Sequence, residues 1–384
     1  MRVSSRGDVD PFIVMDVMTR ARELEAEGRR IIHMEVGQPG TPAPKGAREA
    51  LKSALESEAL GYSVTLGLPA LRARIAALYG EWYDLDLNPD RVVVTTGSSA
   101  GFLLTFASLF DAGARVGIGA PGYPSYRQLL KAMDLEPVIL QTTPEARYQP
   151  RPDDLRGQGL QGLMIASPGN PSGTMLSRTA LSDLMGAAAD EGISLISDEI
   201  YHGLHYEDRA VSALEISDET YVINSFSKYF SMTGWRVGWM VVPEAHVRRV
   251  ERLAQHMFIC APTASQVAAL GALDCHEELQ ANVAVYARNR QLLLEHLPQA
   301  GFTRIAPPDG GFYVYADVRD LTQDSRVFAR EILEQAGVAV TPGLDFDATR
   351  GAGTLRFSYA GATEDLEEAM QRLKTFMAKR PVVV

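Results

Sequence analysis

A single lysine stands among aromatic and small side chains in residues 225–238, Ser-Phe-Ser-Lys-Tyr-Phe-Ser-Met-Thr-Gly-Trp-Arg-Val-Gly. This segment contains no acidic residue, so Lys228 has no carboxylate beside it along the chain. Because an ammonium group is costly to bury, a lysine in apolar surroundings tends to lose its proton. The neutral amine is a nucleophile, and its natural electrophile is a carbonyl carbon. The other lysines lie in polar or amphipathic stretches that we expect to be solvated: Lys45, Lys52, Lys131, Lys374 and Lys379.

Arg236, on the same segment, offers a permanent positive charge that could hold an anion. A nucleophilic amine close to an anion-binding group suggests a Schiff base to an aldehyde that carries a phosphate. Pyridoxal 5'-phosphate (PLP) has both groups. The segment therefore predicts a PLP site centred on Lys228.

Two further segments follow expected strands and could complete such a site. Residues 97–100, Gly-Ser-Ser-Ala, join a strand to a helix, where backbone N–H groups and hydroxyls can cradle a phosphate. Many strand-to-helix loops are rich in Gly and Ser, so this loop is weak evidence when taken singly. Asp198 follows the expected strand 194–197, and a buried carboxylate needs a cation such as a protonated pyridine nitrogen. A helix N-cap is an equally common use of such an aspartate.

Three more residues have both a functional and a structural interpretation. Asn170 lies in the rigid loop 167–173 before a proline, which predicts a cis Asn170–Pro171 bond, although a plain tight turn would also explain the loop's prolines and glycines. Tyr123 could stack on a planar ligand or simply pack, as could Tyr126. Arg356, between two apolar residues on a strand, could fork onto a substrate carboxylate or form a structural salt bridge.

Two other patterns do not support a site. Residues 117–122 have the GxGxxG spacing of dinucleotide-binding loops, but Pro121 removes a backbone donor where the pyrophosphate would need one. His202 and His205 invite a metal site, yet no third ligand stands nearby in the sequence. We expect no metal, and both histidines to be solvated or hydrogen-bonded.

The composition is that of an ordinary globular protein. The chain has 384 residues, of which 46% are hydrophobic and 22% charged, which permits two domains. A formal net charge of -11 argues against nucleic acid or an anionic membrane as the main partner. Cys260 and Cys275 cannot form a disulfide framework, and no signal peptide or membrane-spanning stretch is evident. These features predict a cytoplasmic protein.

Short apolar strands alternate with helices over much of the chain and predict an α/β fold with a largely parallel sheet covered on both faces. Helices are expected at residues 11–28 and 45–57. We expect residues 38–284 to form a large cofactor-binding domain. Residues 1–37 and 285–384 should form a smaller α+β domain that includes the N-terminal helix. The strands expected in the large domain are 91–95, 116–118, 137–140, 163–165, 194–197 and 221–224.

Taken together, these motifs resemble the class I/II aminotransferases, which are fold type I PLP enzymes similar to aspartate aminotransferase. The resemblance extends in order over nearly the whole chain. Residues 225–238 fit the family's attachment-site pattern at every restricted position. The resemblance implies a transaminase that moves an amino group between an α-amino acid and a 2-oxo acid by a ping-pong mechanism.

The resemblance also implies roles for the cofactor's nearest neighbours. Lys228 looks like the lysine that forms the Schiff base and then carries the proton. Asp198 resembles the partner of the pyridine nitrogen. Tyr201 and Asn170 are similar to the pair that hydrogen-bonds the phenolic oxygen, and Tyr123 occupies the place of the stacked aromatic ring.

The phosphate and the substrate have their own implied ligands. Tyr62 looks like the tyrosine that reaches the neighbouring subunit's phosphate, which implies a homodimer with composite active sites. Arg356, with Gly37 and Asn170, resembles the group that binds the substrate carboxylate. The phosphate ligands implied within the same subunit are Ser98, Ser99, Ala100, Ser225 and Arg236.

Two departures from the related aspartate aminotransferases bear on the substrate. Ser99 stands where many of them have a lysine that helps to bind an acidic side chain, and Tyr123 stands where they commonly stack a tryptophan. Both differences favour a small or apolar donor such as alanine. A PLP-dependent β-lyase on the same scaffold and a non-catalytic PLP-binding protein are the alternative functions.

Overall fold

The computed structural model describes residues 1–380, so the last four residues of the predicted small domain, 381–384, lie outside it. A seven-stranded sheet has the order β2-β8-β7-β6-β5-β3-β4. Its strands are parallel except β8, which runs antiparallel to β2 and β7. The α/β fold with a mostly parallel mixed sheet is therefore confirmed. The strands are β2 (Val92–Thr95), β3 (Arg115–Ala120), β4 (Glu136–Gln141), β5 (Gly162–Ala166), β6 (Ser194–Asp198), β7 (Tyr221–Ser225) and β8 (Gly238–Val241).

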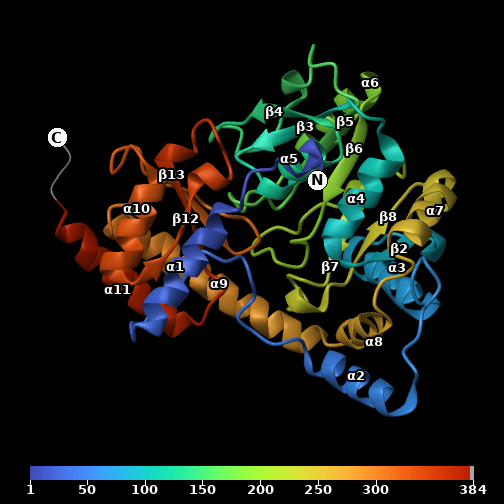
Figure 1. Ribbon diagram of the computed structural model, residues 1–384, viewed down its shortest axis with the longest axis horizontal. Helices are drawn as coiled ribbons and strands as arrows, with labels where there is room; N and C mark the ends of the chain where they lie inside the picture. Colours follow the sequence, from blue (N-terminus) through green and yellow to red (C-terminus); the bar gives the residue numbers. More distant parts are fainter. Residues whose placement is uncertain (381–384) are drawn as a thin grey trace.

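Helices cover both faces of this sheet (Figure 1). On one face, Val93 of β2 and Ile196 of β6 pack in a cluster with Phe102 of α4. On the other face, Val94 and Leu195 join a second cluster. Burial on both sides explains why the strands are continuous apolar runs. The helices are α4 (Gly97–Leu109), α5 (Pro124–Ala132) and α7 (Val247–Met257) on the first face, and α3 (Pro69–Tyr83), α6 (Arg178–Asp190) and α8 (Thr263–Ala272) on the second.

The C-terminal part of the chain builds a smaller antiparallel sheet of order β12-β13-β10-β9. A short parallel pair, β1 and β11, ties residues near the N-terminus to this part. Its elements are β9 (Arg304–Ala306), β10 (Tyr313–Asp317), α10 (Ser325–Glu331), the π-turn Ile332–Ala336, β11 (Val338–Ala339), β12 (Thr341–Pro342), β13 (Thr354–Ser358), α11 (Thr363–Ala378) and β1 (Ile32–His33).

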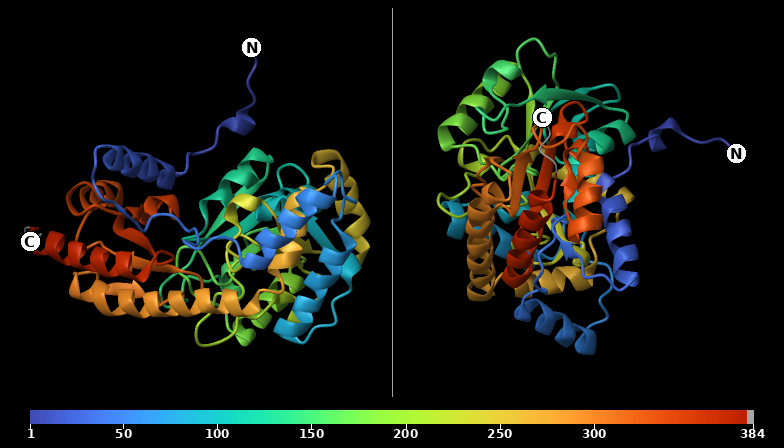
Figure 2. Two further views of the ribbon diagram at one scale, coloured as in Figure 1. Left: turned by 90° about the horizontal axis from the view of Figure 1, so that it is seen from below. Right: turned by 90° about the vertical axis from the view of Figure 1, so that its left-hand side faces the viewer.

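Three helices connect or flank the two sheets. The long α9 (His276–Gln299) runs from α8 to the smaller sheet, where it packs against α11 (Figure 2). The helix α2 (Lys45–Ser57) packs on α8, and α1 (Ile13–Ala26) lies beside β11 and β12, as expected for the N-terminal helix. Because α9 runs through the predicted boundary at residue 284, the division into 38–284 and the flanking segments stays a prediction.

Most expected elements are present, with local differences. The helix expected at 11–28 begins at Ile13, because Phe12 is still extended. The helix expected at 45–57 has these bounds. The elements that were not predicted include α3 and the strand β8, which directly follows the lysine segment. Within residues 1–380, no helix combines the length and the apolar character needed to cross a bilayer.

Candidate active site

A cavity of about 380 Å³ opens at the carboxyl ends of the parallel strands, between the two sheets. Parallel α/β sheets generally bind ligands at this edge. Ala100 and Ser225 do not line the cavity, but each adjoins it: Ala100 follows Ser99, and Ser225 Oγ lies 2.8 Å from Oγ of the lining residue Ser227. The predicted site residues that line it are Gly37, Ser98, Ser99, Tyr123, Asn170, Asp198, Tyr201, Lys228, Arg236 and Arg356.

Tyr62 lies elsewhere. Its side chain is 84% exposed and does not line the cavity of its own subunit. It thus points away from its own site, as expected for a residue that would act in a neighbouring subunit.

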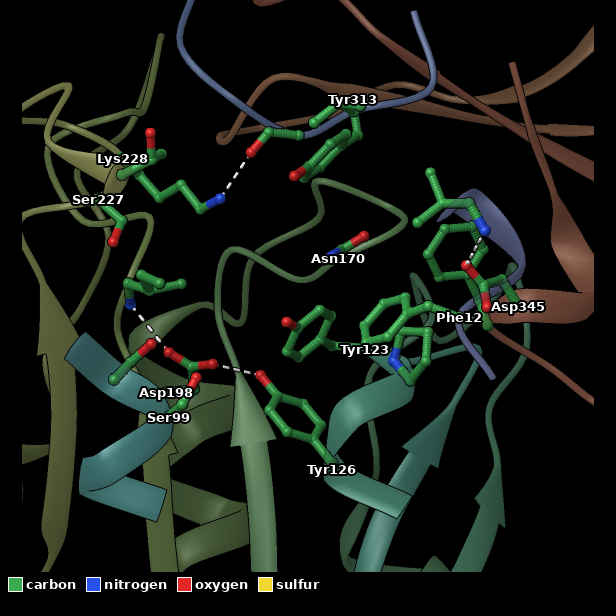
Figure 3. A pocket seen from close by; sticks show the side chains of 18 of the residues that line it. Phe12, Ser99, Tyr123, Tyr126, Asn170, Asp198, Ser227, Lys228, Tyr313 and Asp345 are labelled. Atoms are coloured by element: carbon green, nitrogen blue, oxygen red, sulfur yellow. Dashed lines mark hydrogen bonds between the residues drawn. The ribbon is translucent and has the colours of Figure 1, made fainter. Parts of the chain in front are cut away.

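Lys228 lies in the turn after β7 and extends its amine into the cavity (Figure 3). The Nζ atom donates a hydrogen bond to the carbonyl oxygen of Gly37 at 2.6 Å. Desolvation lowers the pKa of Lys228 to about 8, and the nearby charge of Arg356 acts in the same direction. A Cβ at position 37 would overlap the hydroxyl of Tyr313, so glycine suits this position. With a pKa of about 8, about a tenth of the Lys228 amine is neutral and nucleophilic at pH 7, far more than for an ordinary lysine.

Asp198 ends β6 and is 3% exposed. Its Oδ1 accepts a hydrogen bond from the backbone N–H of Ile200 at 3.0 Å, and its Oδ2 accepts one from the hydroxyl of Tyr126. Burial raises the pKa of Asp198 to about 6, while these two hydrogen bonds oppose the rise. The N-cap interpretation is wrong, because residues 199–203 form turns and not a helix. The carboxylate is thus held ready for a cationic partner.

An anion site lies at the start of α4. Its N-cap residue, Thr96, makes no side-chain cap, so the first N–H groups of the helix remain available to a ligand. Gly97 has φ +73°, and a Cβ there would lie 2.4 Å from the Arg236 guanidinium. Glycine thus lets the arginine lie against the helix terminus. With the hydroxyls of Ser98 and Ser99, this cradle suits a phosphate group.

Arg356 projects from β13 into the cavity and is 4% exposed. One guanidinium nitrogen donates to Asn170 Oδ1 at 2.8 Å, and the other to Thr341 Oγ1 at 3.2 Å and to a backbone carbonyl. The guanidinium lies 4.3 Å from the ring centre of Tyr313. Within residues 1–380 no carboxylate pairs with it and its buried Nε has no partner, so the salt-bridge interpretation is wrong. A planar, unneutralised guanidinium of this kind binds carboxylates well.

The loop that carries Asn170 is built as expected. The Asn170–Pro171 bond is cis, which confirms that prediction, and the bonds before Pro121 and Pro168 are cis as well.

His202, considered above as a metal ligand, is buried and hydrogen-bonded to the Tyr83 hydroxyl at 2.6 Å and to a carbonyl oxygen at 2.8 Å.

Comparison with known proteins decides the family. The family model described as aminotransferase class I and II matches residues 29–373. The chain belongs to this family. Valine–pyruvate aminotransferase of Mycobacterium tuberculosis is 44% identical over 98% of both chains. A protein from Silicibacter pomeroyi, known from its crystal structure, is 69% identical in sequence to this chain. The two structures superpose with a TM-score of 0.95 over 99% of this chain and 100% of that one. An aminotransferase structure from M. tuberculosis is 43% identical with a TM-score of 0.97, again over 99% and 100%.

This aminotransferase is a PLP-dependent enzyme that moves an amino group between an α-amino acid and a 2-oxo acid by a ping-pong mechanism. The named relatives are transaminases, which favours transamination over the lyase and the non-catalytic alternatives. The cavity also fits the cofactor on physical grounds. It holds an amine of lowered pKa, a buried carboxylate and a phosphate cradle, which match the three polar ends of PLP.

Sequence reasoning missed several residues that line the site. Tyr126 was considered for packing or stacking only, yet it donates to Asp198, and the Tyr313 hydroxyl lies 2.9 Å from that of Tyr201. Neither contact has a signal in sequence spacing. The aminotransferase also places one face of α1 along the cavity, although its helical spacing of apolar residues predicted only packing. The lining residues of this segment are Phe12, Val14, Met15 and Met18.

Proposed function

We propose that the aminotransferase takes apolar, branched amino acids such as valine as donors and a small 2-oxo acid such as pyruvate as acceptor. The observation that carries this proposal is the apolar wall, formed by Phe12, Val14, Met15 and Met18, which lines the cavity. Phe12 lies across the cavity from Lys228 (Figure 3). Burying a valine side chain against such a wall contributes about 1.5–3 kcal/mol. The relative named valine–pyruvate aminotransferase supports the same choice.

The charges of the cavity also disfavour an acidic donor. Among residues 1–380, the cationic side chains that line the cavity are Lys228, Arg236 and Arg356. We assign these to the reacting amine, the cofactor phosphate and the substrate α-carboxylate respectively. No lining cation of the protomer is then left for a side-chain carboxylate, and Ser99 offers only a hydroxyl.

The chain's own residues would act as follows. Arg356 and Asn170 bind and orient the α-carboxylate, and Gly37 supplies a backbone contact next to it. Bound PLP supplies an electron-withdrawing ring that acidifies the substrate Cα–H. Asp198 would keep a positive charge at the ring nitrogen, and Tyr123 would stack on the ring. The Lys228 amine would accept the proton from the substrate Cα and return it to the former aldehyde carbon of the cofactor.

Other residues would hold the cofactor in place. Tyr201 and Asn170 would hydrogen-bond the phenolic oxygen of the cofactor. The phosphate ligands within the subunit would be Ser98, Ser99, Ala100, Ser225 and Arg236.

We further propose that the active unit is a homodimer in which Tyr62 reaches the partner's phosphate site. Tyr62 is one of five exposed apolar side chains in residues 55–64 and 257–259, which a second copy would cover. The Thr263 hydroxyl donates a hydrogen bond to the carbonyl oxygen of Gly61 at 2.5 Å. This bond holds the segment next to Tyr62 against the start of α8. The exposed side chains are Leu55, Tyr62, Val64, Met257 and Ile259.

A cytoplasmic location is also proposed. Cys260 and Cys275 are both free thiols, as is usual in a reducing compartment. Separation of cytoplasmic from secreted and membrane fractions, followed by detection of the protein, tests this directly.

A donor panel tests the proposed substrate. The holoenzyme is mixed with one amino acid at a time, and the loss of its visible absorbance is followed in a single half-reaction. Valine and leucine should react with a specificity constant at least about tenfold above that of aspartate or glutamate, as expected for burying the aliphatic side chain. Fastest reaction with acidic donors would reject the proposal. Release of ammonia without a 2-oxo acid acceptor would instead favour the lyase.

A further inference from the structure

The apolar wall depends on a helix whose N-terminus lacks a local cap. The first turn of α1 follows Phe12, which makes no side-chain cap. The buried residues of α1, Ala21 and Leu24, lie in its second half, where they pack against Ile31 and Leu333. In the first half, Val17 packs against this cluster, whereas Val14, Met15 and Met18 line the cavity. The position of the first turn therefore depends on further contacts.

Asp345 supplies the missing cap from far along the chain. Its Oδ1 accepts a hydrogen bond from the N–H of Ile13 at 3.0 Å, and its Oδ2 accepts one from the N–H of Val14 at 3.2 Å. Asp345 is 3% exposed and lines the cavity. A negative charge at a helix N-terminus is also favoured by the helix dipole. One carboxylate thus binds the first two N–H donors of α1.

The turn that carries Asp345 is itself held firmly. Gly343 begins this turn (Gly343–Asp345), and a Cβ on it would lie 1.8 Å from Thr354 Oγ1. The carbonyl of Phe346 accepts a hydrogen bond from the N–H of Gly122 at 3.0 Å. Arg350 donates to the carbonyl of Ala120 at 2.7 Å. The turn is thereby anchored to the end of β3, next to the cofactor end of the site.

We infer that Asp345 is a positioning residue that sets donor selectivity by fixing the first turn of α1, and with it Val14 and Met15, over the substrate side chain. This inference rests on the proposed preference for apolar donors. The carboxylate acts through α1 and need not touch the substrate. Loss of the cap should let the first turn fray, since helix ends open locally when their orphan N–H groups lose partners. The wall would then bind large donor side chains more weakly, whereas the binding of small ones would change less.

Hydrogen exchange and donor kinetics test this inference together. In Asp345→Ala, the amides of Ile13 and Val14 should exchange at least about tenfold faster, as expected for a lost cap. The KM for valine and leucine should rise about five- to tenfold, and the ratio of the valine KM to the alanine KM should rise at least about threefold. Asp345→Asn keeps one acceptor oxygen and the side-chain shape, so it should give an intermediate effect even if the alanine variant folds poorly.

The matched control is Ser177→Ala, which removes the side-chain cap of α6, a helix that does not line the cavity. It should leave exchange at Ile13 and Val14 and the ratio of the valine and alanine KM values unchanged. Unchanged exchange in both Asp345 variants, or faster exchange with no selective rise of KM, would overturn the inference. A wild-type preference for acidic donors would contradict the proposed substrate alone, because exchange at α1 measures the cap directly.

Discussion

The hydroxyl of Tyr126 donates a hydrogen bond to the carboxylate of Asp198 at the base of the cavity. Both side chains are buried, and Tyr126 comes from the first turns of α5 while Asp198 ends β6. The hydrogen bond stabilises the charged form of an acid whose pKa burial has raised to about 6. Tyr126 therefore helps to keep Asp198 ionised for the cofactor's ring nitrogen.

Replacing Tyr126 with phenylalanine should weaken this arrangement. Loss of the hydrogen bond removes an influence that lowers the pKa of Asp198, so the pKa should rise further. The acid limb of the pH–activity profile should then move to higher pH, and PLP should bind about tenfold more weakly, as expected for a hydrogen bond to a charged group. Absorbance titration of the apoprotein with PLP measures the affinity. The control is Tyr221→Phe, which removes a buried hydroxyl that is hydrogen-bonded to Ser108 and His246. It should change neither the pH–activity profile nor the affinity for PLP.

Lys228 should be the most reactive lysine of the apoprotein. With a pKa of about 8, roughly half of its side chains are neutral at pH 8, against less than about 1% for an ordinary lysine. A small acylating reagent at pH 8, followed by peptide mapping, should modify Lys228 before the other lysines. The other lysines serve as internal controls, and equal or faster modification of Lys45 or Lys131 would contradict the lowered pKa. Addition of PLP should protect Lys228.

Hybrid dimers test whether Tyr62 acts across a subunit interface. One subunit carries Lys228→Ala and the other carries Tyr62→Ala. If Tyr62 serves the partner, one site of the hybrid has both defects and the other site has none, so mixing two weakly active variants should restore activity. Activity of the mixture that equals the mean of the separate variants would place Tyr62 in its own subunit's site or outside any site. Size-exclusion chromatography with light scattering gives the oligomeric state independently.

His33 should contribute stability that depends on pH. Its Nδ1 lies 2.8 Å from Oε1 of the buried Glu35, and its Nε2 lies 3.0 Å from Glu25. The hydrogen bond with Glu35 is the largest influence that raises the pKa of His33, to about 9 in the folded protein. A raised pKa means that the stabilisation is complete below about pH 6.5, the pKa of an unfolded histidine, and is lost as the pH rises through 9.

The His33→Ala variant should therefore unfold more easily at pH 6 by about 1 kcal/mol, a value reduced for the half-exposed position of the side chain. The difference from the wild type should shrink by pH 9.5. Thermal unfolding at both pH values measures it, with the exposed His256→Ala on α7 as control. A difference that is the same at pH 6 and pH 9.5 would show that the ion pair does not contribute.

Prediction from sequence succeeded where one residue and its neighbours carry the information. The apolar strands before Asp198 and before Asn170 marked the carboxyl edge of a parallel sheet, and the residues after such strands meet there whatever the details of packing. The α3 helix and the β8 strand were not predicted. The β8 strand follows the lysine segment along the chain. An antiparallel strand among parallel ones has no distinct sequence pattern, because it is buried on the same two faces as its neighbours.

The sequence by itself determined the chemistry at Lys228, the strand-end position of Asp198 and the family to which the chain belongs. These depend on local order along the chain, which packing does not alter. The tertiary structure decided which side chains complete the site: Tyr126 on Asp198, Tyr313 beside Arg356, and Asp345 on the first turn of α1. Those contacts join segments far apart in the chain, and their geometry exists only after the two sheets have packed together.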